Sequence, residues 1–191
     1  MADESMMIPL GTEAPSFALR DVVSGRLYQL DSFTGQAALL VMFLCRHCPY
    51  VQHIEQAVAT LGCDYDDTGL SMIGISSNDP VHYPDDAPDR LKEMARRLGF
   101  RFPLCFDETQ EVAKAYKAAC TPDFYLFDGQ RRLVYRGQFD ESRPGSGKPV
   151  TGRDLRAAID AVLAGKPVPA RQKPSIGCSI KWKPGNAPPS A

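Results

Sequence analysis

Two cysteines three positions apart, in the segment Cys45-Arg46-His47-Cys48-Pro49, have the spacing of a redox-active pair. If they occupy a first helical turn, they can close a disulfide with little backbone movement. The helix N-terminus, together with Arg46 and His47, favours negative charge on a nearby sulfur. We therefore expect the Cys45 thiol to be exposed, to have a lowered pKa and to attack a substrate, while Cys48 resolves the product.

The same spacing also occurs in metal sites, so a Cu- or Zn-binding module is the alternative reading. A structural zinc site needs four ligands, and the other cysteines (Cys63, Cys105, Cys120, Cys178) stand alone in the sequence. Redox chemistry is therefore favoured over metal binding. Cys120 is a candidate third redox thiol, Cys178 is left open as a thiol that forms or resolves a mixed disulfide, and Cys63 and Cys105 are expected to be structural.

The elements around the pair predict an α/β fold. Residues 36–44 form a continuous apolar run, which is typical of a central strand covered on both faces. Apolar residues at helical spacing follow over residues 51–61, with Gly62 expected to end the helix. Residues 70–76 predict the next strand, and a strand-helix-strand unit of this kind requires a parallel pairing.

Further elements are predicted on both sides of this unit. An N-terminal β-hairpin is expected within residues 11–30, with its turn at Ser24-Gly25. Residues 79–89 are rich in proline and aspartate and predict an acidic loop. The remaining predictions are a helix over 90–98 capped by Asp89, a strand over 100–106, a helix from Thr109, a hairpin over 124–135 and a helix over 154–163 capped by Thr151.

The domain prediction is one α/β domain, residues 1–165, followed by an arm, residues 166–191. The arm has six prolines, five basic residues and no acidic residue. We nevertheless expect it to be packed, because Ile176, Ile180 and Trp182 offer apolar anchors, and its basic residues could face the aspartates of residues 79–89. It would lie on its own domain or clasp a second copy in a homodimer.

Composition excludes several classes of function. The chain has 191 residues, 43% of them hydrophobic, and a formal net charge of -1, so no positive field is present to hold nucleic acid. The longest apolar run, residues 37–45, is about half the roughly 20 residues that a membrane-spanning helix needs. No secretory signal is apparent at the start of the sequence, so a cytoplasmic location is expected.

These motifs together resemble the thioredoxin superfamily. The cysteine pair after a central strand is followed by Thr121-Pro122, which opens a predicted hairpin. The segments 11–19 and 30–35 are similar to the redoxin branch that contains alkyl hydroperoxide reductase and thiol-specific antioxidant proteins. Cys-x-His-Cys-Pro and the late segment 173–184 resemble peroxiredoxin-like thioredoxin family proteins. The resemblance implies a thioredoxin fold, Cys45 and Cys48 as the redox pair, and a cis bond at Thr121-Pro122 facing them.

The resemblance implies a thiol-disulfide oxidoreductase that acts on protein or small-molecule disulfides. It would need no bound cofactor and would draw electrons from a thioredoxin- or glutathione-type donor. A thiol peroxidase is the alternative in the same class. Its efficiency would be low, because Met42 occupies the place of the threonine that peroxiredoxins keep three residues before their reactive cysteine. An interaction protein that has kept the fold without turnover is a third reading.

Overall fold

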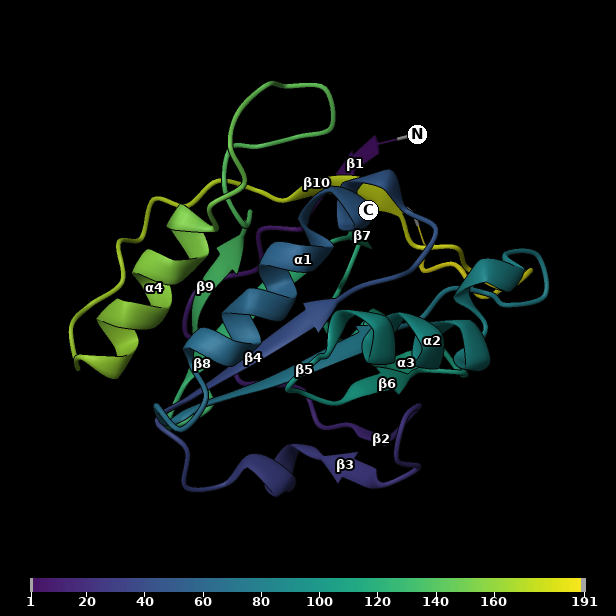
Figure 1. Ribbon diagram of the computed structural model, residues 1–191. Coiled ribbons are helices and arrows are strands. Elements are labelled where there is room, and N and C mark those ends of the chain that lie inside the picture. The colour runs from purple at the N-terminus through teal and green to yellow at the C-terminus, as the bar shows by residue number, and fades with distance from the viewer. Residues whose placement is uncertain (1, 190–191) are drawn as a thin grey trace.

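A seven-stranded mixed sheet forms the centre of the computed structural model, which describes residues 2–189 (Figure 1). The order of its strands is β3-β2-β6-β5-β4-β8-β9. The strands are β2 (Ala18–Asp21), β3 (Leu27–Gln29), β4 (Ala38–Phe43), β5 (Leu70–Ser76), β6 (Leu104–Phe106), β8 (Asp123–Asp128) and β9 (Leu133–Gly137). The arrangement is a thioredoxin-type α/β fold, which confirms the predicted fold class.

Strand β4 lies in the interior of the sheet. It pairs in parallel with β5 and antiparallel with β8, and all six of its residues are buried. Alternate side chains enter different cores: Leu40 and Met42 face one, and Leu39 and Val41 face the other. Burial on both faces explains why the sequence shows an unbroken apolar run rather than an alternating one.

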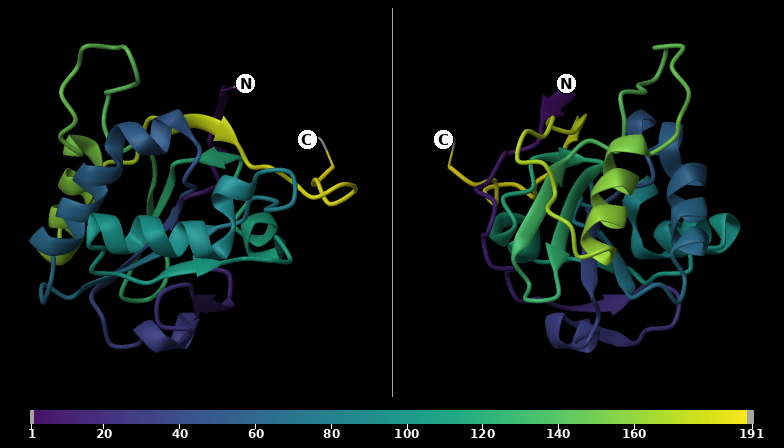
Figure 2. Two further views of the ribbon diagram at one scale, coloured as in Figure 1. Left: turned by 45° about the vertical axis from the view of Figure 1, so that its right-hand side comes forward. Right: turned by 90° about the vertical axis from the view of Figure 1, so that its left-hand side faces the viewer.

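Helices cover both faces of the sheet. Helices α1 (Pro49–Asp64), α2 (Pro88–Leu98) and α4 (Arg153–Leu163) contribute to the cores on one face, as the turned views show (Figure 2). On the other face, the short helix α3 (Glu111–Ala115) packs with the N-terminal segment. In the described part of the chain, no helix is both long enough and apolar enough to span a bilayer.

The predicted N-terminal hairpin is confirmed, and it joins the main sheet. Strands β2 and β3 pair antiparallel, and β2 also pairs with β6. The C-terminal hairpin, β8 with β9, is confirmed as well. The Asp128 carboxylate accepts backbone N–H groups from Gln130 and Arg132, at 2.9 Å each, and thereby closes the connecting loop.

Residues 166–189 contain a strand that was not predicted. Strand β10 (Ile176–Ser179) lies between β1 (Ala2–Glu4) and β7 (Cys120–Thr121) in a second, three-stranded sheet. The expected anchors contribute unequally, since Ile180 is 3% exposed whereas Trp182 is only partly buried against the same core. Among the described residues, no basic side chain of this segment forms an ion pair with the aspartates of residues 79–89, although the charges of Lys183 and Asp79 interact at longer range. Lys173 forms an ion pair with Glu141.

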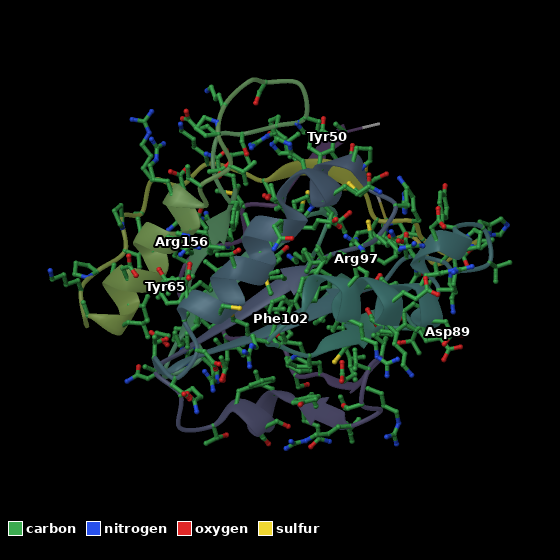
Figure 3. The ribbon with its side chains drawn as sticks, in the orientation of Figure 1. Tyr50, Tyr65, Asp89, Arg97, Phe102 and Arg156 are labelled. Atoms are coloured by element: carbon green, nitrogen blue, oxygen red, sulfur yellow. The ribbon has the colours of Figure 1, made fainter. Side chains whose placement is uncertain are left out.

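Gly62 does not end its helix, which continues to Asp64. Gly62 instead packs closely against Phe102, since a Cβ at Gly62 would lie 3.0 Å from the Phe102 ring. Farther along the helix, Tyr65 donates a hydrogen bond to Asp160 at 2.6 Å and lies under the guanidinium of Arg156, so that α1 and α4 are held together at the surface (Figure 3). The apolar pattern located the helix, but its end depends on these tertiary contacts.

The predicted caps were also wrong in detail. Helix α2 begins at Pro88 after Ala87, with Asp89 inside its first turn, and the N-cap of α4 is Gly152 rather than Thr151. A distant residue supplies the anchor for α4, because the Asp140 carboxylate accepts the N–H groups of Thr151 and Gly152 at 2.6 Å each. The predicted strand over 100–106 is limited to β6, and α3 begins after Gln110 rather than at Thr109.

The position of β10 gives a stability prediction. A Cβ at Gly177 would overlap the carbonyl group of Thr121 on β7, so Gly177→Ala must push the two strands apart. We expect a loss of about 1–3 kcal/mol in the free energy of unfolding, the range for overpacking, measured by denaturant titration. Ser179→Ala in the same strand is the matched control. Equal stability of the two variants would contradict this packing.

Candidate redox site

The cysteine pair lies where β4 passes into α1. Strand β4 ends at Phe43, and Cys48 is the N-cap residue of α1, with Pro49 at the first helical position. Proline suits that position because its missing N–H is not needed there. Both cysteines are in the reduced state and buried, with Cys45 1% and Cys48 0% exposed. The expectation of an exposed leading thiol was therefore wrong.

Thr121 contacts both sulfurs. The Cys45 Sγ lies 3.1 Å from the Thr121 hydroxyl, and the Cys48 Sγ lies 3.2 Å from the Thr121 carbonyl oxygen. The Thr121-Pro122 peptide bond is cis, as the resemblance implied. The structure therefore brings Cys45, Cys48 and Thr121-Pro122 together although 76 residues separate Cys45 from Thr121.

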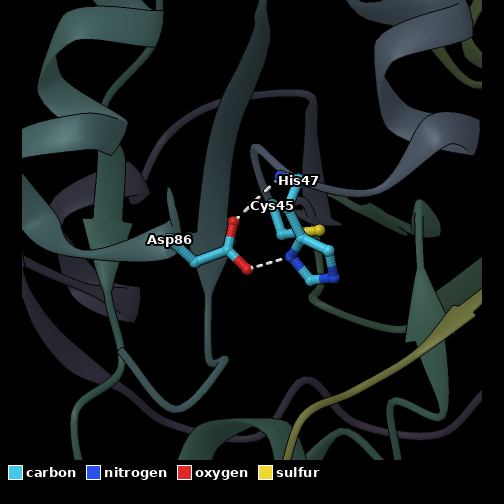
Figure 4. A group of neighbouring side chains, drawn as sticks. All are labelled: Cys45, His47 and Asp86. Carbon is cyan, nitrogen blue, oxygen red and sulfur yellow. Dashed lines mark hydrogen bonds and ion pairs between the residues drawn. The ribbon is translucent and has the colours of Figure 1, made fainter. Parts of the chain in front are cut away.

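A buried carboxylate, which the sequence analysis missed, holds the loop between the cysteines. The Asp86 Oδ1 accepts the backbone N–H groups of Arg46 at 2.7 Å and His47 at 3.1 Å. Its Oδ2 accepts a hydrogen bond from the Asn78 amide at 2.8 Å and lies against the Nδ1 of His47 (Figure 4). Residues 79–89 were read as an acidic loop, yet Asp86 is fully buried there, in the short 3-10 helix Pro84–Asp86.

The two basic residues between the cysteines are both held by acids. The Arg46 guanidinium lies 3.5 Å from Asp85 and 4.0 Å from Glu93. The hydrogen bond with Asp86 raises the pKa of His47, while hydrogen bonds from His47 and Asn78 keep the pKa of Asp86 low in spite of its burial. The negative charges of these acids offset the positive charges of Arg46 and His47, so the two basic residues do little to stabilise a Cys45 thiolate.

The prediction of a lowered Cys45 pKa was consequently wrong. Burial raises the pKa of Cys45 well above its ordinary value, and its hydrogen bond to Cys48 and the charge of Asp86 raise it further. The pKa of Cys48 is lowered to about 5, because the Cys45 thiol donates to its sulfur and because the Cys178 thiol and the Val51 N–H also point to it. The N-terminus of α1 thus stabilises a thiolate on Cys48 rather than on Cys45.

The remaining cysteines have different surroundings. Cys120 is buried, its thiol donates to the Pro122 carbonyl at 3.8 Å, and burial with the Asp123 charge raises its pKa. This environment does not favour a redox thiol. Cys105 is buried with its pKa raised to about 12, and Cys63 is exposed near the end of α1.

The site also contains a group of potential metal ligands. Ligand atoms of Cys45, His47 and Asp86 lie within 4.8 Å of one another. Both oxygens of Asp86, however, already accept hydrogen bonds from the Cys45–Cys48 loop and from Asn78. A metal ion would have to displace these donors and loosen the loop, so the donor set fits the ordering of the loop better than metal coordination.

The His47–Asp86 contact gives a pH prediction. Asp86→Asn removes the carboxylate, so the pKa of His47 should fall toward the ordinary value of about 6.5. Because the folded-state pKa is raised, the imidazolium favours folding below about pH 6.5, and this stabilisation is lost as pH rises through the folded value. Proton NMR titration of the His47 ring measures the shift.

Asp85→Asn is the control for this titration, since Asp85 is a neighbouring carboxylate whose side chain is 69% exposed. We expect Asp85→Asn to leave the pKa of His47 close to that of the unmodified protein. An equal fall in both variants would show that general surface charge, rather than the Asp86 contact, sets the pKa of His47.

Comparison with solved structures shows near-complete matches to two proteins. An uncharacterized conserved protein from Geobacillus kaustophilus matches with a TM-score of 0.94 and 54% identity, covering 100% of this chain and 98% of that one. A hypothetical protein from Sinorhizobium meliloti 1021 gives 0.93 and 50%, covering 95% and 99%. The thioredoxin domain of a thiol-disulfide oxidoreductase from Bacteroides vulgatus shares the fold, with a TM-score of 0.63 and 18% identity over 82% of this chain and 99% of that one.

Comparison of sequences leads to the same superfamily. The thiol-disulfide oxidoreductase ResA of Geobacillus thermodenitrificans is 24% identical over 131 residues, which are 65% of this chain and 67% of that protein. The model of the AhpC/TSA family matches residues 10–136, a segment that includes the cysteine pair and Thr121-Pro122. With the thioredoxin-type fold and a site assembled within that matched segment, the chain belongs to the AhpC/TSA family.

Proposed function

We propose that the protein is a thiol-disulfide oxidoreductase that cycles between the Cys45/Cys48 dithiol and a Cys45–Cys48 disulfide. The observation that carries the proposal is that both sulfurs lie against Thr121, the Cys45 Sγ 3.1 Å from its hydroxyl and the Cys48 Sγ 3.2 Å from its carbonyl oxygen. The neighbouring Cys45 thiol lowers the pKa of Cys48 to about 5. Such a pair supplies a thiolate at neutral pH and a second sulfur within reach. Relatives named thiol-disulfide oxidoreductases support the reaction class.

In the first step, Cys48 attacks a substrate disulfide. Only the thiolate is nucleophilic, and the lowered pKa of Cys48 favours the thiolate on that sulfur. Its sulfur forms a bond to one substrate sulfur, the substrate S–S bond breaks, and the other substrate sulfur leaves as a thiolate. This assignment reverses the roles expected from the sequence, in which Cys45 attacked.

In the second step, Cys45 resolves the mixed disulfide. Once Cys48 is bonded to substrate it carries no charge, so two causes of the raised Cys45 pKa disappear: the hydrogen bond to Cys48 and its repulsion. The Thr121 hydroxyl, 3.1 Å away, remains to stabilise a Cys45 thiolate. Cys45 then attacks the Cys48 sulfur, the Cys45–Cys48 disulfide forms, and the substrate sulfur departs and takes up a proton.

The substrate is a protein or small-molecule disulfide, and a thioredoxin- or glutathione-type thiol donor would return the electrons. Tyr50 of α1, Phe139, Arg143 and Ile176 surround Pro122 and leave a hollow of only about 20 Å³, which is too small for a substrate chain. Both sulfurs are covered in the reduced protein, so the substrate must displace part of this surface before it reacts.

Thiol peroxidase activity is the second candidate, because the matched family favours it. The Cys48 thiolate would attack one peroxide oxygen, the O–O bond would break, and the other oxygen would leave as hydroxide or alkoxide. Cys45 would then condense with the Cys48 sulfenic acid to form the Cys45–Cys48 disulfide and release water. The guanidinium of Arg46, however, is engaged by Asp85 and Glu93 rather than by a sulfur. Disulfide exchange is therefore the better-supported reaction.

Reduction of a protein disulfide tests the function. With insulin as substrate and dithiothreitol as reductant, we expect Cys45→Ser and Cys48→Ser each to lose at least about 99% of the catalysed rate, as befits residues that act as one unit. The exposed Cys63→Ser variant is the matched control and should keep full activity. Oxidation of the pair by hydrogen peroxide faster than disulfide exchange would instead favour the peroxidase.

Reaction with Ellman's disulfide tests which cysteine attacks. In a Cys63→Ser background at pH 7, release of the first thionitrobenzoate should slow by about tenfold or more in Cys48→Ser, because the low-pKa thiolate is gone. Cys45→Ser should retain the first release, since Cys48 is still present. The opposite pattern would return the attacking role to Cys45.

A further inference from the structure

Cys178 lies beside the cysteine pair although 130 residues separate it from Cys48. In the pairing of β10 with β7, Cys178 is opposite Thr121, the residue that contacts both sulfurs of the pair. The Cys178 side chain packs on the buried cluster that contains Cys45 and Cys48, and β10 also packs against α1.

The fold fixes this position from two sides. Strand β1 pairs with the other edge of β10, where Cys178 is opposite Ala2. On the inner side, Gly177 lies so close to the Thr121 carbonyl that no side chain fits between the strands. The location of Cys178 therefore follows from strand register rather than from a loose surface segment.

The contact is with Cys48 in particular. Cys178 packs on the buried cluster that contains Cys48, and the two thiols lie close enough to shift each other's pKa. Cys178 is partly exposed, whereas both members of the pair are buried. Among the cysteines outside the pair, all of which lie in the described residues, Cys178 alone lowers the pKa of Cys48 and is also partly exposed.

We propose that Cys178 is a third redox thiol that exchanges with Cys45 for the bond to Cys48. The proposal rests on the proposed function, because it starts from the Cys45–Cys48 disulfide. The Cys178 thiolate attacks the Cys48 sulfur, a Cys48–Cys178 bond forms, the Cys45–Cys48 bond breaks, and Cys45 leaves as a thiolate. One disulfide and one thiolate are present before and after, so the exchange needs no external oxidant or reductant.

Oxidation of the pair itself promotes this exchange. In the reduced protein the pKa of Cys178 is raised to about 11, by partial burial and then by its hydrogen bond to Cys48 and the charge there. When Cys48 enters a disulfide its charge is lost, while the lowering effect of Lys181 remains. Cys178 thus becomes easier to deprotonate once there is a disulfide to attack.

The exchange changes which sulfur an electron donor can reach. In the Cys45–Cys48 disulfide both sulfurs belong to buried residues, whereas the Cys48–Cys178 disulfide includes one partly exposed residue. A reducing dithiol from solution would attack Cys178, form a mixed disulfide with it and release the Cys48 thiolate; the second thiol of the donor would then release Cys178. The substrate would therefore react at Cys48, whereas the electron donor would react at Cys178.

Disulfide mapping tests the proposal. The Cys45→Ser/Cys63→Ser variant is treated with diamide, quenched in acid, alkylated with N-ethylmaleimide and mapped by mass spectrometry. We expect an intramolecular Cys48–Cys178 disulfide. The matched control, Cys48→Ser/Cys63→Ser, should leave Cys45 and Cys178 alkylated as free thiols, since Cys178 contacts Cys48 and not Cys45.

The unsubstituted protein supplies a second readout that needs no variant to fold. After diamide oxidation and incubation at pH 8.5, exchange should leave a fraction of molecules with Cys45 alkylated and Cys178 protected. Cys45–Cys48 as the sole intramolecular disulfide, together with no Cys48–Cys178 bond in the double variant, would overturn the role of Cys178 and leave the proposed function standing. Absence of every disulfide at Cys48 would overturn both.

Discussion

The buried carboxylate of Asp86 is the interaction on which the organisation of the site depends. A charged group without water is costly unless hydrogen bonds compensate it, and here donors from Arg46, His47 and Asn78 do so. Asn78 in turn accepts the N–H of Lys181 from the C-terminal segment at 2.8 Å. One side chain thus ties the cysteine loop to the end of β5 and, through Asn78, to the segment that follows β10.

The Asp86 carboxylate also influences which cysteine of the reduced pair is the thiolate. Its negative charge raises the pKa of Cys45, while the N-terminus of α1 presents the Val51 N–H to Cys48. The two cysteines are therefore unequal because one faces an anion and the other faces a helix N-terminus. Arg46 and His47 order the loop through acids instead of adding positive charge to a sulfur.

Local pattern was sufficient for much of the fold and for the pair, but not for its electrostatics. The apolar run before Cys45, the helical spacing after Cys48 and the Thr121-Pro122 hairpin signal all depend on neighbouring residues, and each located its element. Asp86 was missed because its proline-rich surroundings look like a solvated loop, and its burial comes from amides 39 and 40 residues away. The burial of Cys45 and the strand around Cys178 likewise depend on contacts between the two ends of the chain, which no local pattern contains.

Those two ends meet at the cysteine pair, since β1 begins at Ala2 and its partner β10 ends at Ser179. A chain synthesised from its N-terminus therefore produces Cys45, Cys48 and Thr121 well before the strand that packs over them. During translation the pair belongs to an unfinished domain, and its sulfurs are not yet covered by β10. Formation of β10 is thus the step that covers the sulfurs, so the pair is uncovered early in synthesis and covered late.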